Sequence, residues 1–477
     1  MRTKHFLITT LALLSLAAGA VGEEVAGLPL HMEKLGAGAI RLWLGDHVST
    51  TGVVALATEK GIVVVDTLGI PSADTELRRI IARELGREDF EVLVNTHEHL
   101  DHTGGNSVYA DCTIVAHERC AAGIVEALGR RDRMIEWQSA RATELEQEIE
   151  TESDPVAVKA LRERQTLDRL NLEFLTGGAT PSLPTLTFSD RLTLDLGDVT
   201  LELYSITGMH SASDIAVLVP ERGLLLTGDT MADVWLTDTP GCLAAFAARN
   251  GVPHDFPRQL RNWDLLLARK GEIRDLIPGH WNGDLTLEGF EARVNYVRAL
   301  WDGINDAFRQ GQTLAKVLAA YQLDVAFPHL ASSPGFSARN NYSTITEMWK
   351  IASGQQSAAE RLHAMIEEGA SDESLREVLG QRGRDDARYY FSEGEVNAWG
   401  YNLLQHGEVA KAIRLFRLNV GLYPEAWNVY DSLGEALLAA EETDEAIRMY
   451  ERSLEINPEN TNGRDVLARI RSSGTSE

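Results

Sequence analysis

The residues with the clearest capacity for chemistry lie in one short run, His97-Glu98-His99-Leu100-Asp101-His102. Three of the 13 histidines of the chain fall within these positions, together with an aspartate. A single histidine is usually explained by packing or a hydrogen bond. Burying several imidazoles and a carboxylate at one strand end without a counter-ion is costly. Imidazole and carboxylate are good ligands for zinc-like ions, so the run predicts a metal site that uses His97, His99, Asp101 and His102.

Further ligands are expected from three positions where a predicted strand ends. His210 follows Ile206-Thr207-Gly208-Met209, Asp229 follows Leu226-Thr227-Gly228, and His280 follows Ile277-Pro278-Gly279. In each case a glycine next to the strand end lets the backbone turn tightly, and the turn then presents the polar side chain. Each position is a weak signal alone, but the set in this order predicts that all three complete the metal site.

Short apolar runs separated by turns predict the sheets that must position these ligands. Residues 39–66 indicate an antiparallel meander, and residues 91–95 form a buried strand that leads directly into the histidine run. Other strands are expected at 113–116, 185–189, 192–196, 199–206, 214–219, 223–227 and 273–277, and helices at 73–86, 257–270 and 286–310. Because each half runs strands first and a helix last, the pattern favours an α/β fold, a four-layer αβ/βα sandwich with two mixed sheets face to face.

The catalytic domain is expected to span residues 30–310 and to contain a helical hairpin inserted at 118–180. A long polar helical stretch is interrupted at Ser153-Asp154-Pro155, where an N-cap residue precedes a proline suited to the first helical turn. Gly177-Gly178 ends the second helix.

The remainder of the chain is expected to be all helical, with a linker region at 311–394 and repeats at 395–472. Several residues recur at a spacing of 34, for example Gly400 and Gly434, because 434 − 400 = 34. Phe416 and Tyr450 keep the same offset, as do Pro424 and Pro458. This period resembles that of tetratricopeptide repeats, which predicts a surface for a protein partner or for self-association.

Composition limits the cellular setting. The chain has 477 residues and a formal net charge of −26, which disfavours binding to nucleic acid or to anionic membrane surfaces. Residues 1–22 combine a basic start, an apolar run and small residues, so they read as a secretory signal peptide and predict a periplasmic or secreted protein without membrane insertion after cleavage. Three cysteines exclude a disulfide framework, although a bond between Cys112 and Cys120 stays open.

Together these motifs resemble the metallo-β-lactamase superfamily. The signature His-x-His-x-Asp-His appears at residues 97–102 and is followed by Thr103-Gly104-Gly105-Asn106. The later motifs correspond to Gly208-Met209-His210-Ser211, Gly228-Asp229-Thr230 and Pro278-Gly279-His280. The resemblance covers residues from about 35 to 285, and it implies the metallo-β-lactamase-like sandwich for this part of the chain.

The resemblance also implies roles for the ligands. His97, His99 and His210 would hold a first metal, Asp101, His102 and His280 a second, and Asp229 would bridge them. Asp66 would support the ligand loop. Two zinc ions per chain, about 3.5–4 Å apart, would generate a bridging hydroxide that attacks an ester, lactam, thioester or related bond. Asp101 is then the expected catalytic residue, because its carboxylate can take the proton of the nucleophile.

Two other functions remain open from the sequence. One is a mononuclear iron enzyme of the same fold, of the sulfur dioxygenase type, which uses His97, His99 and His210 alone. The other is a partner-binding protein that acts through its helical repeats. Trp235, His254 and His329 are weaker candidates for the walls of a substrate pocket. The substrate itself is not encoded in any motif, and neither is the oligomeric state.

Overall fold

The computed structural model describes residues 23–473 except 37, 49, 208–209, 232–254, 281–285, 332–337 and 385–386, and it leaves out the side chains of 338–340, 343, 405 and 472–473. The expected signal segment, Trp235, Cys242 and His254 therefore lie outside the described residues. The chain divides into two compact units. The first contains residues up to Arg298 with 332–340, and the second contains Ala299–Ala331 with the residues from Asn341 onward.

The larger sheet of the first unit has eight strands in sequence order. They are β1 (Glu24–Val25), β2 (Leu28–Lys34), β3 (Ala39–Leu44), β4 (Val53–Thr58), β5 (Gly61–Val65), β6 (Phe90–Val94), β7 (Thr113–His117) and β8 (Leu186–Phe188). Neighbours from β1 to β5 pair antiparallel, whereas β5 to β8 pair parallel. The meander predicted from the sequence at residues 39–66 corresponds to β3, β4 and β5 of the antiparallel half.

The smaller sheet has the order β13-β12-β11-β10-β9. Its strands are β9 (Arg191–Asp195), β10 (Thr200–Ser205), β11 (Ile215–Val219), β12 (Leu224–Gly228) and β13 (Asp275–Pro278). All pairs are antiparallel except β12 with β13, which are parallel. As a result β12 and β13 both end at the same edge of the sheet, and each is followed by a predicted ligand.

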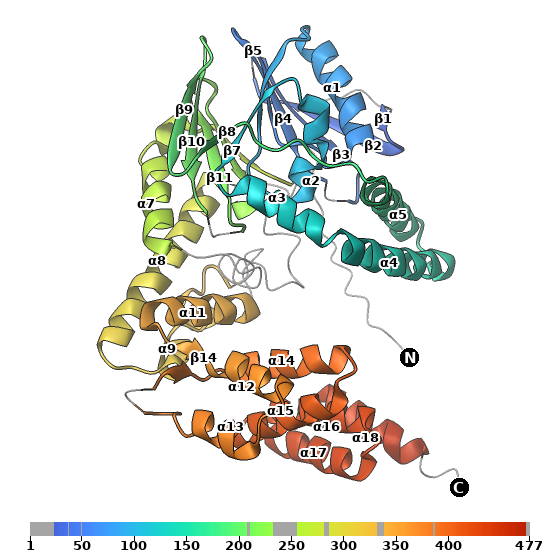
Figure 1. Ribbon diagram of the computed structural model, residues 1–477, viewed down its shortest axis with the longest axis vertical. Coiled ribbons are helices and arrows are strands. Elements are labelled where there is room, and N and C mark those ends of the chain that lie inside the picture. Colours follow the sequence, from blue (N-terminus) through green and yellow to red (C-terminus); the bar gives the residue numbers. More distant parts are fainter. Residues whose placement is uncertain are drawn as a thin grey trace. The chain divides into compact units, whose positions relative to one another are not determined.

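The two sheets bury a shared apolar layer between them. Val54, Val63 and Val92 of the larger sheet belong to the same buried cluster as Val217 and Leu226 of the smaller one. Helix α1 (Pro71–Leu85) packs on the outer side of the larger sheet and α7 (Phe256–Leu267) on that of the smaller (Figure 1). This is the four-layer αβ/βα sandwich predicted from the sequence.

Three helices interrupt the first unit between β7 and β8, namely α3 (Cys120–Gly129), α4 (Arg131–Thr151) and α5 (Pro155–Thr176). Helices α4 and α5 pack against each other (Figure 1). The Asp154 side chain accepts a hydrogen bond from the Val156 amide, with Pro155 at the start of the helix, as the sequence predicts. Cys112 and Cys120 are buried free thiols, and no disulfide joins them.

The second unit is helical. The division between the units falls within the long helix α8 (Leu287–Arg309). The helices that follow are α9 (Leu314–Ala320), α10 (Leu323–Ala326), α11 (Ala338–Ser353), α12 (Ala358–Glu367), α13 (Asp372–Leu379), α14 (Glu393–Gln405), α15 (Val409–Leu422), α16 (Trp427–Ala439), α17 (Thr443–Ile456) and α18 (Thr461–Ser473). Two short strands, β14 (Gln356–Ser357) and β15 (Tyr389–Tyr390), lie among them.

The sequence period of 34 has a counterpart in these helices. The starts of α14, α16 and α18 are spaced by 427 − 393 = 34 and 461 − 427 = 34 residues, and those of α15 and α17 by 443 − 409 = 34. A Cβ atom at Gly400 would lie 2.4 Å from the Phe416 ring, and one at Gly434 would lie 2.9 Å from the Tyr450 ring. Each glycine therefore lets an aromatic ring of the next helix pack directly on its backbone. Within the described residues, no helix has the length and apolar character needed to cross a bilayer.

Candidate metal centre

The predicted ligands come from the carboxyl ends of strands in both sheets. His97 and His99 follow β6, and the single-turn helix α2 (Leu100–Thr103) then carries Asp101 and His102. His210 lies in the loop between β10 and β11, Asp229 directly follows β12, and His280 follows β13. Parallel strands place their carboxyl ends at one edge of a sheet, which is why residues distant in sequence meet here.

The structure brings all seven predicted ligands together in overlapping groups. His97, His99 and His210 form one group, and Asp101, His102 and His280 form another. Within each group the candidate ligand atoms lie within 4.8 Å of one another. Below, these are called the first group and the second group.

Asp229 lies between the two groups. Its Oδ2 is 3.5 Å from His210 Nε2 in the first group and 3.2 Å from His280 Nε2 in the second. Its Oδ1 is 3.4 Å from His102 Nε2. A carboxylate in this position can offer one oxygen to each of two adjacent cations.

The imidazole nitrogens are spaced as ligands of a small cation would be. His99 Nδ1 is 3.0 Å from His210 Nε2, and His102 Nε2 is 3.3 Å from His280 Nε2. Ligands of a tetrahedral zinc ion, with bonds of about 2.0–2.1 Å, lie about 3.3 Å apart. His97 Nε2 is buried and makes no hydrogen bond within the described part of the chain. Leaving such an atom without a partner is costly, so the site fits a metal ion.

The two groups differ in charge. Burial lowers the pKa of His97 well below its usual value, and the charge of His102 acts in the same direction. Burial likewise lowers the pKa of His210, to about 3, against the opposing effect of Asp229. His280 shows the reverse, because Asp229 and Asp101 outweigh burial and raise its pKa to about 10. His97 and His210 of the first group are therefore uncharged at neutral pH, whereas His280 of the second group retains a proton unless a cation replaces it.

Asp66 supports a ligand of each group, His102 directly and His97 through Thr96. It is buried, and its φ of +62° lies in the left-handed region that aspartate adopts infrequently. Its Oδ2 is 2.9 Å from His102 Nδ1 and accepts a hydrogen bond from Thr96 Oγ1 at 2.7 Å, while Oδ1 accepts one from the Thr96 amide. Thr96 Oγ1 is in turn 3.1 Å from His97 Nδ1. A carboxylate on the distal imidazole nitrogen fixes the ring for metal binding, which agrees with the support role expected for Asp66.

The second group is braced by residues that sequence reasoning missed. Thr51 Oγ1 donates to the Asp101 carbonyl at 2.7 Å. The guanidinium of Arg41, which is buried, donates from Nη2 to the carbonyls of Pro278 and His280 at 3.2 and 3.1 Å. Burial lowers the pKa of Arg41 to about 10, so it is still charged at neutral pH.

Glu98 is a second feature that the sequence reasoning did not single out. It stands between two ligands of the first group, and its side chain is buried. Its carboxylate accepts hydrogen bonds from the Ala212 amide at 3.0 Å and the Ser213 amide at 3.2 Å, and also from the Ser213 hydroxyl. These donors lie in the loop that carries His210. The only available sequence signal was the acidic residue inside the histidine run itself.

Glycine is required beside two ligands for different reasons. Gly228, before Asp229, has a φ of +52°. Gly279, before His280, is needed for close approach, because a Cβ there would lie 2.2 Å from Asp229 Oδ1 and 3.1 Å from His102 Cε1. Of the other predicted positions, Gly208 and Met209 fall outside the described residues, as do Trp235 and His254, and His329 belongs to the second unit.

A further group of candidate ligand atoms comes from Asp46, His47 and Glu163, none of which is a predicted ligand. The Lys159 ammonium is 2.5 Å from Asp46 Oδ2 and 3.9 Å from Glu163 Oε1. This group already has a cation of its own, and it is not assigned as a metal site.

Comparison with known proteins agrees with this geometry. Residues 44–280 match the description of the metallo-beta-lactamase superfamily. The chain is 33% identical over 94 residues to the alpha subunit of a 2,4-dinitroanisole O-demethylase from Nocardioides sp. (strain JS1661), and 33% identical over 66 residues to its beta subunit. These matches cover 19% and 14% of this chain and 27% and 21% of the relatives, so the chain spans about a quarter of the curated relatives it matches.

Among solved structures, a metallo-beta-lactamase from Pontibacter korlensis aligns with a TM-score of 0.33 and 18% identity, over 53% of this chain and 92% of that one. The sec-alkylsulfatase Pisa1 from Pseudomonas sp. aligns with a TM-score of 0.43 and 13% identity, over 90% of this chain and 66% of that one. The sequence match at residues 44–280 carries the assignment, and the ligand groups described above lie within it. This part of the chain belongs to the metallo-beta-lactamase superfamily.

Proposed function

We propose that the chain is an exported hydrolase that uses two zinc ions to cleave an ester, lactam, thioester or related bond. The observation that carries the proposal is the convergence of seven ligands in two groups with Asp229 between them. A mononuclear iron enzyme would need the first group alone, and it would give no reason for Asp101, His102 and His280 to meet. When bound, two such ions lower the pKa of a shared water and stabilise negative charge that develops on the substrate.

Residues of the chain itself would hold the ions, orient the ligands and accept a proton. His97, His99 and His210 offer nitrogen atoms to a first ion, and Asp66 and Thr96 hold His102 and His97 in orientation. Asp101 has a side chain that is 52% exposed, and its Oδ2 lies 3.3 Å from His280 Nε2. It therefore faces both the second group and solvent, where it can accept the proton that the attacking water loses.

Metal analysis of the purified chain tests the proposal. We expect about two zinc ions per chain after growth in zinc-replete medium, with activity lost to a chelator and restored by zinc. His280→Ala should retain about one ion, whereas His406→Ala, which changes an exposed histidine of the second unit, should retain two. One iron and no zinc would instead support the dioxygenase alternative.

The substrate is best sought with the zinc-loaded protein. A hydrolysis screen should include a lactam, a lactone, a thioester, a phosphodiester and an alkyl sulfate. It should also include 2,4-dinitroanisole, because the curated relatives are named for its O-demethylation. Turnover of one class that chelation abolishes, and that Asp101→Asn reduces, would identify the bond that is cleaved.

Export is proposed from the order of basic, apolar and small residues at positions 1–22. We expect the mature chain to begin near Glu23. N-terminal sequencing of the protein from the periplasmic fraction checks this, and an intact Met1 in the cytoplasmic fraction would contradict it.

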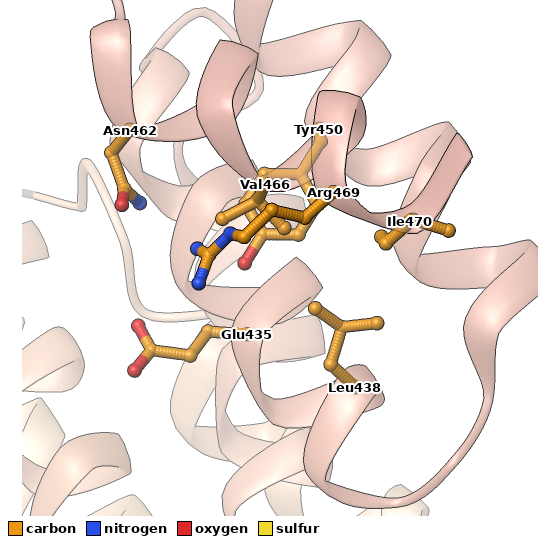
Figure 2. Close-up of a pocket in the computed structure, with 7 residues that line it drawn as sticks. All are labelled: Glu435, Leu438, Tyr450, Asn462, Val466, Arg469 and Ile470. Carbon is orange, nitrogen blue, oxygen red and sulfur yellow. The ribbon is translucent and has the colours of Figure 1, made fainter. Parts of the chain in front are cut away.

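We propose in addition that the repeats mediate self-association or bind a protein partner. A cavity of about 490 Å³ opens between α16, α17 and α18, with the apolar side chains of Leu438, Val466 and Ile470 beside the polar groups of Glu435 and Arg469 (Figure 2). Sedimentation velocity over a range of concentrations tests self-association. We expect Ile470→Glu to weaken it and Ala468→Glu, on an exposed position of the same helix, to leave it unchanged.

A further inference from the structure

The loop that presents His210 has a backbone held by two carboxylates. The amides of His210 and Ser211 both donate to Asp214 Oδ2 at 2.8 Å. The next two amides, of Ala212 and Ser213, donate to Glu98 at 3.0 and 3.2 Å. Four consecutive amides are therefore satisfied, two by a carboxylate of the loop itself and two by a carboxylate from another segment. The Ser213 amide also donates to Ser211 Oγ at 3.1 Å.

The other segment is the one that carries the remaining ligands of the first group. Glu98 is flanked by His97 and His99, so its backbone moves with both of these ligands. Its carboxylate is bonded to the loop of the third ligand, His210. Across this connection His99 Nδ1 and His210 Nε2 face each other at 3.0 Å. One side chain thus ties together the two segments whose separation determines the size of the first group.

Helix α3 also packs closely against the Glu98 side chain. A Cβ atom at Gly123 would lie 2.3 Å from Glu98 Cγ and 2.7 Å from Glu98 Cβ. Real Cβ contacts are not this short, so the Glu98 side chain passes over the helix where α3 has no side chain. The first helix of the inserted segment is in this way in direct contact with the support of the metal centre.

We propose that Glu98 is a positioning residue for the first metal, and that Gly123 of α3 is needed for it to act. Glu98 sets the separation of His99 and His210 before any ion binds. This inference rests on the proposed function in so far as it assumes that the first group binds a metal. Groups that orient metal ligands typically contribute 10–100-fold to metal affinity.

Glutamine is an informative substitution here. It keeps the size of the side chain, but one of its two oxygens becomes an NH₂ group, which cannot accept from an amide. Glu98→Gln therefore loses at least one loop contact, and Glu98→Ala loses all three. Glu118→Gln serves as the control, because Glu118 is exposed and lies just before α3.

Chelator competition on the full-length chain measures the two zinc dissociation constants. His210→Ala identifies the constant of the first group, since it removes a ligand. We expect Glu98→Gln and Glu98→Ala to raise that same constant by about 10–100-fold and to leave the other unchanged. A general loss of packing would instead lower the melting temperature of the variant, and it would raise both zinc dissociation constants or neither of them. Wild-type constants in both Glu98 variants would overturn the inference.

Gly123→Ala provides an independent test from the helix side. The added methyl group must displace Glu98, so we expect the same selective rise in the first constant. Gly129→Ala is the matched control, because it lies in the same helix and a Cβ there meets no atom within 4 Å. Equal constants in these two variants would show that the contact of α3 with Glu98 does not matter for the metal.

Amide exchange on the metal-free protein tests the same connection without any ion. We expect the peptide covering residues 205–216 to exchange about 10-fold faster in Glu98→Ala, because the Ala212 amide loses its acceptor and the Ser213 amide loses one of its two. If the wild-type chain binds no metal, the proposed function fails, and unchanged exchange in Glu98→Ala would refute the positioning role separately.

Discussion

Asp101 differs from the other candidate ligands in its exposure. Its side chain is 52% exposed, whereas those of His102, His280 and Asp229 are 0%, 15% and 8% exposed. Asp101→Asn keeps the shape but removes the charge and the base, while every ligand of the first group is unchanged. We expect a folded protein with about one metal and a maximal rate lower by about 10²-fold or more, with little change in KM. Near-normal turnover with two metals bound would show that Asp101 has no catalytic role.

The charges of the two groups lead to an expected pH dependence of metal binding. The pKa of His210 is lowered to about 3 by burial, so the first ion displaces no proton from it at neutral pH. Asp229 and Asp101 overcome burial and raise the pKa of His280 to about 10, so the second ion must release a proton there.

Between pH 6 and 8 we therefore expect the second zinc constant to tighten by at least about 10-fold for each pH unit, more steeply than the first, because the pKa of His102 is raised as well as that of His280. Calorimetric titration in buffers of different ionisation enthalpy counts the released protons. His280→Ala should reduce this pH dependence. Equal proton release at both steps would contradict this assignment of charge.

At this scale the sequence predicts ligands better than their supports. His97, His210 and His280 stand out by residue type and by position at a strand end. Arg41 does not, because the carbonyls it binds are 237 and 239 residues away and nothing local marks the pairing. Glu98 likewise acts through its hydrogen bond with the Ser213 amide, which is distant in sequence. Only the packing of two loops brings these two groups together.

The loop between β5 and α1 shows how an element supports the centre. Thr67 Oγ1 donates to the His102 carbonyl at 2.9 Å, and Asp74, in the first turn of α1, accepts from the amides of Leu68 at 2.8 Å and Ile70 at 3.1 Å. Asp74 is fully buried, and burial raises its pKa from 3.8 to about 7.

Because the folded state then binds more protons than the unfolded state between pH 4 and 7, Asp74 should make the protein less stable as pH rises through this range. We expect the free energy of unfolding of the wild type, relative to Asp74→Asn, to fall by on the order of a few kcal/mol between pH 5 and pH 8. Denaturant unfolding at these pH values measures it. Glu76 is exposed on the same helix, so the free energy of unfolding of Glu76→Gln should change with pH as that of the wild type does.

The strand predictions succeed for buried apolar runs and for the edge strand β8, but they miss the first two strands of the larger sheet. The strands β4, β5 and β11 are almost wholly buried, and their apolar runs mark them clearly. The strands β1 and β2 were not predicted. β2 is mostly half-buried and contains Pro29 and His31, so it shows no regular alternation.

On the scale of the whole molecule, the two units have separate apolar cores. The sandwich buries its clusters around β4 and β11, and the second unit buries its own around Leu362, Phe416 and Leu437. The predicted ligands all belong to the first unit. Metal binding stabilises the state that binds it, so removal of the metal should act on the unfolding of the first unit.

Calorimetry of the full-length chain can separate the two cores. We expect a chelator to lower the melting temperature of one transition and Gly434→Ala to lower that of another. In Gly434→Ala the added Cβ would lie 2.9 Å from the buried Tyr450 ring, and such overpacking typically costs about 1–3 kcal/mol. Gly421→Ala, on α15, meets no atom within 4 Å and should lower neither. A single transition that moves with both the chelator and Gly434→Ala would mean that the repeats and the metal-binding sandwich unfold together, and that the helical unit is part of what holds the metal centre in place.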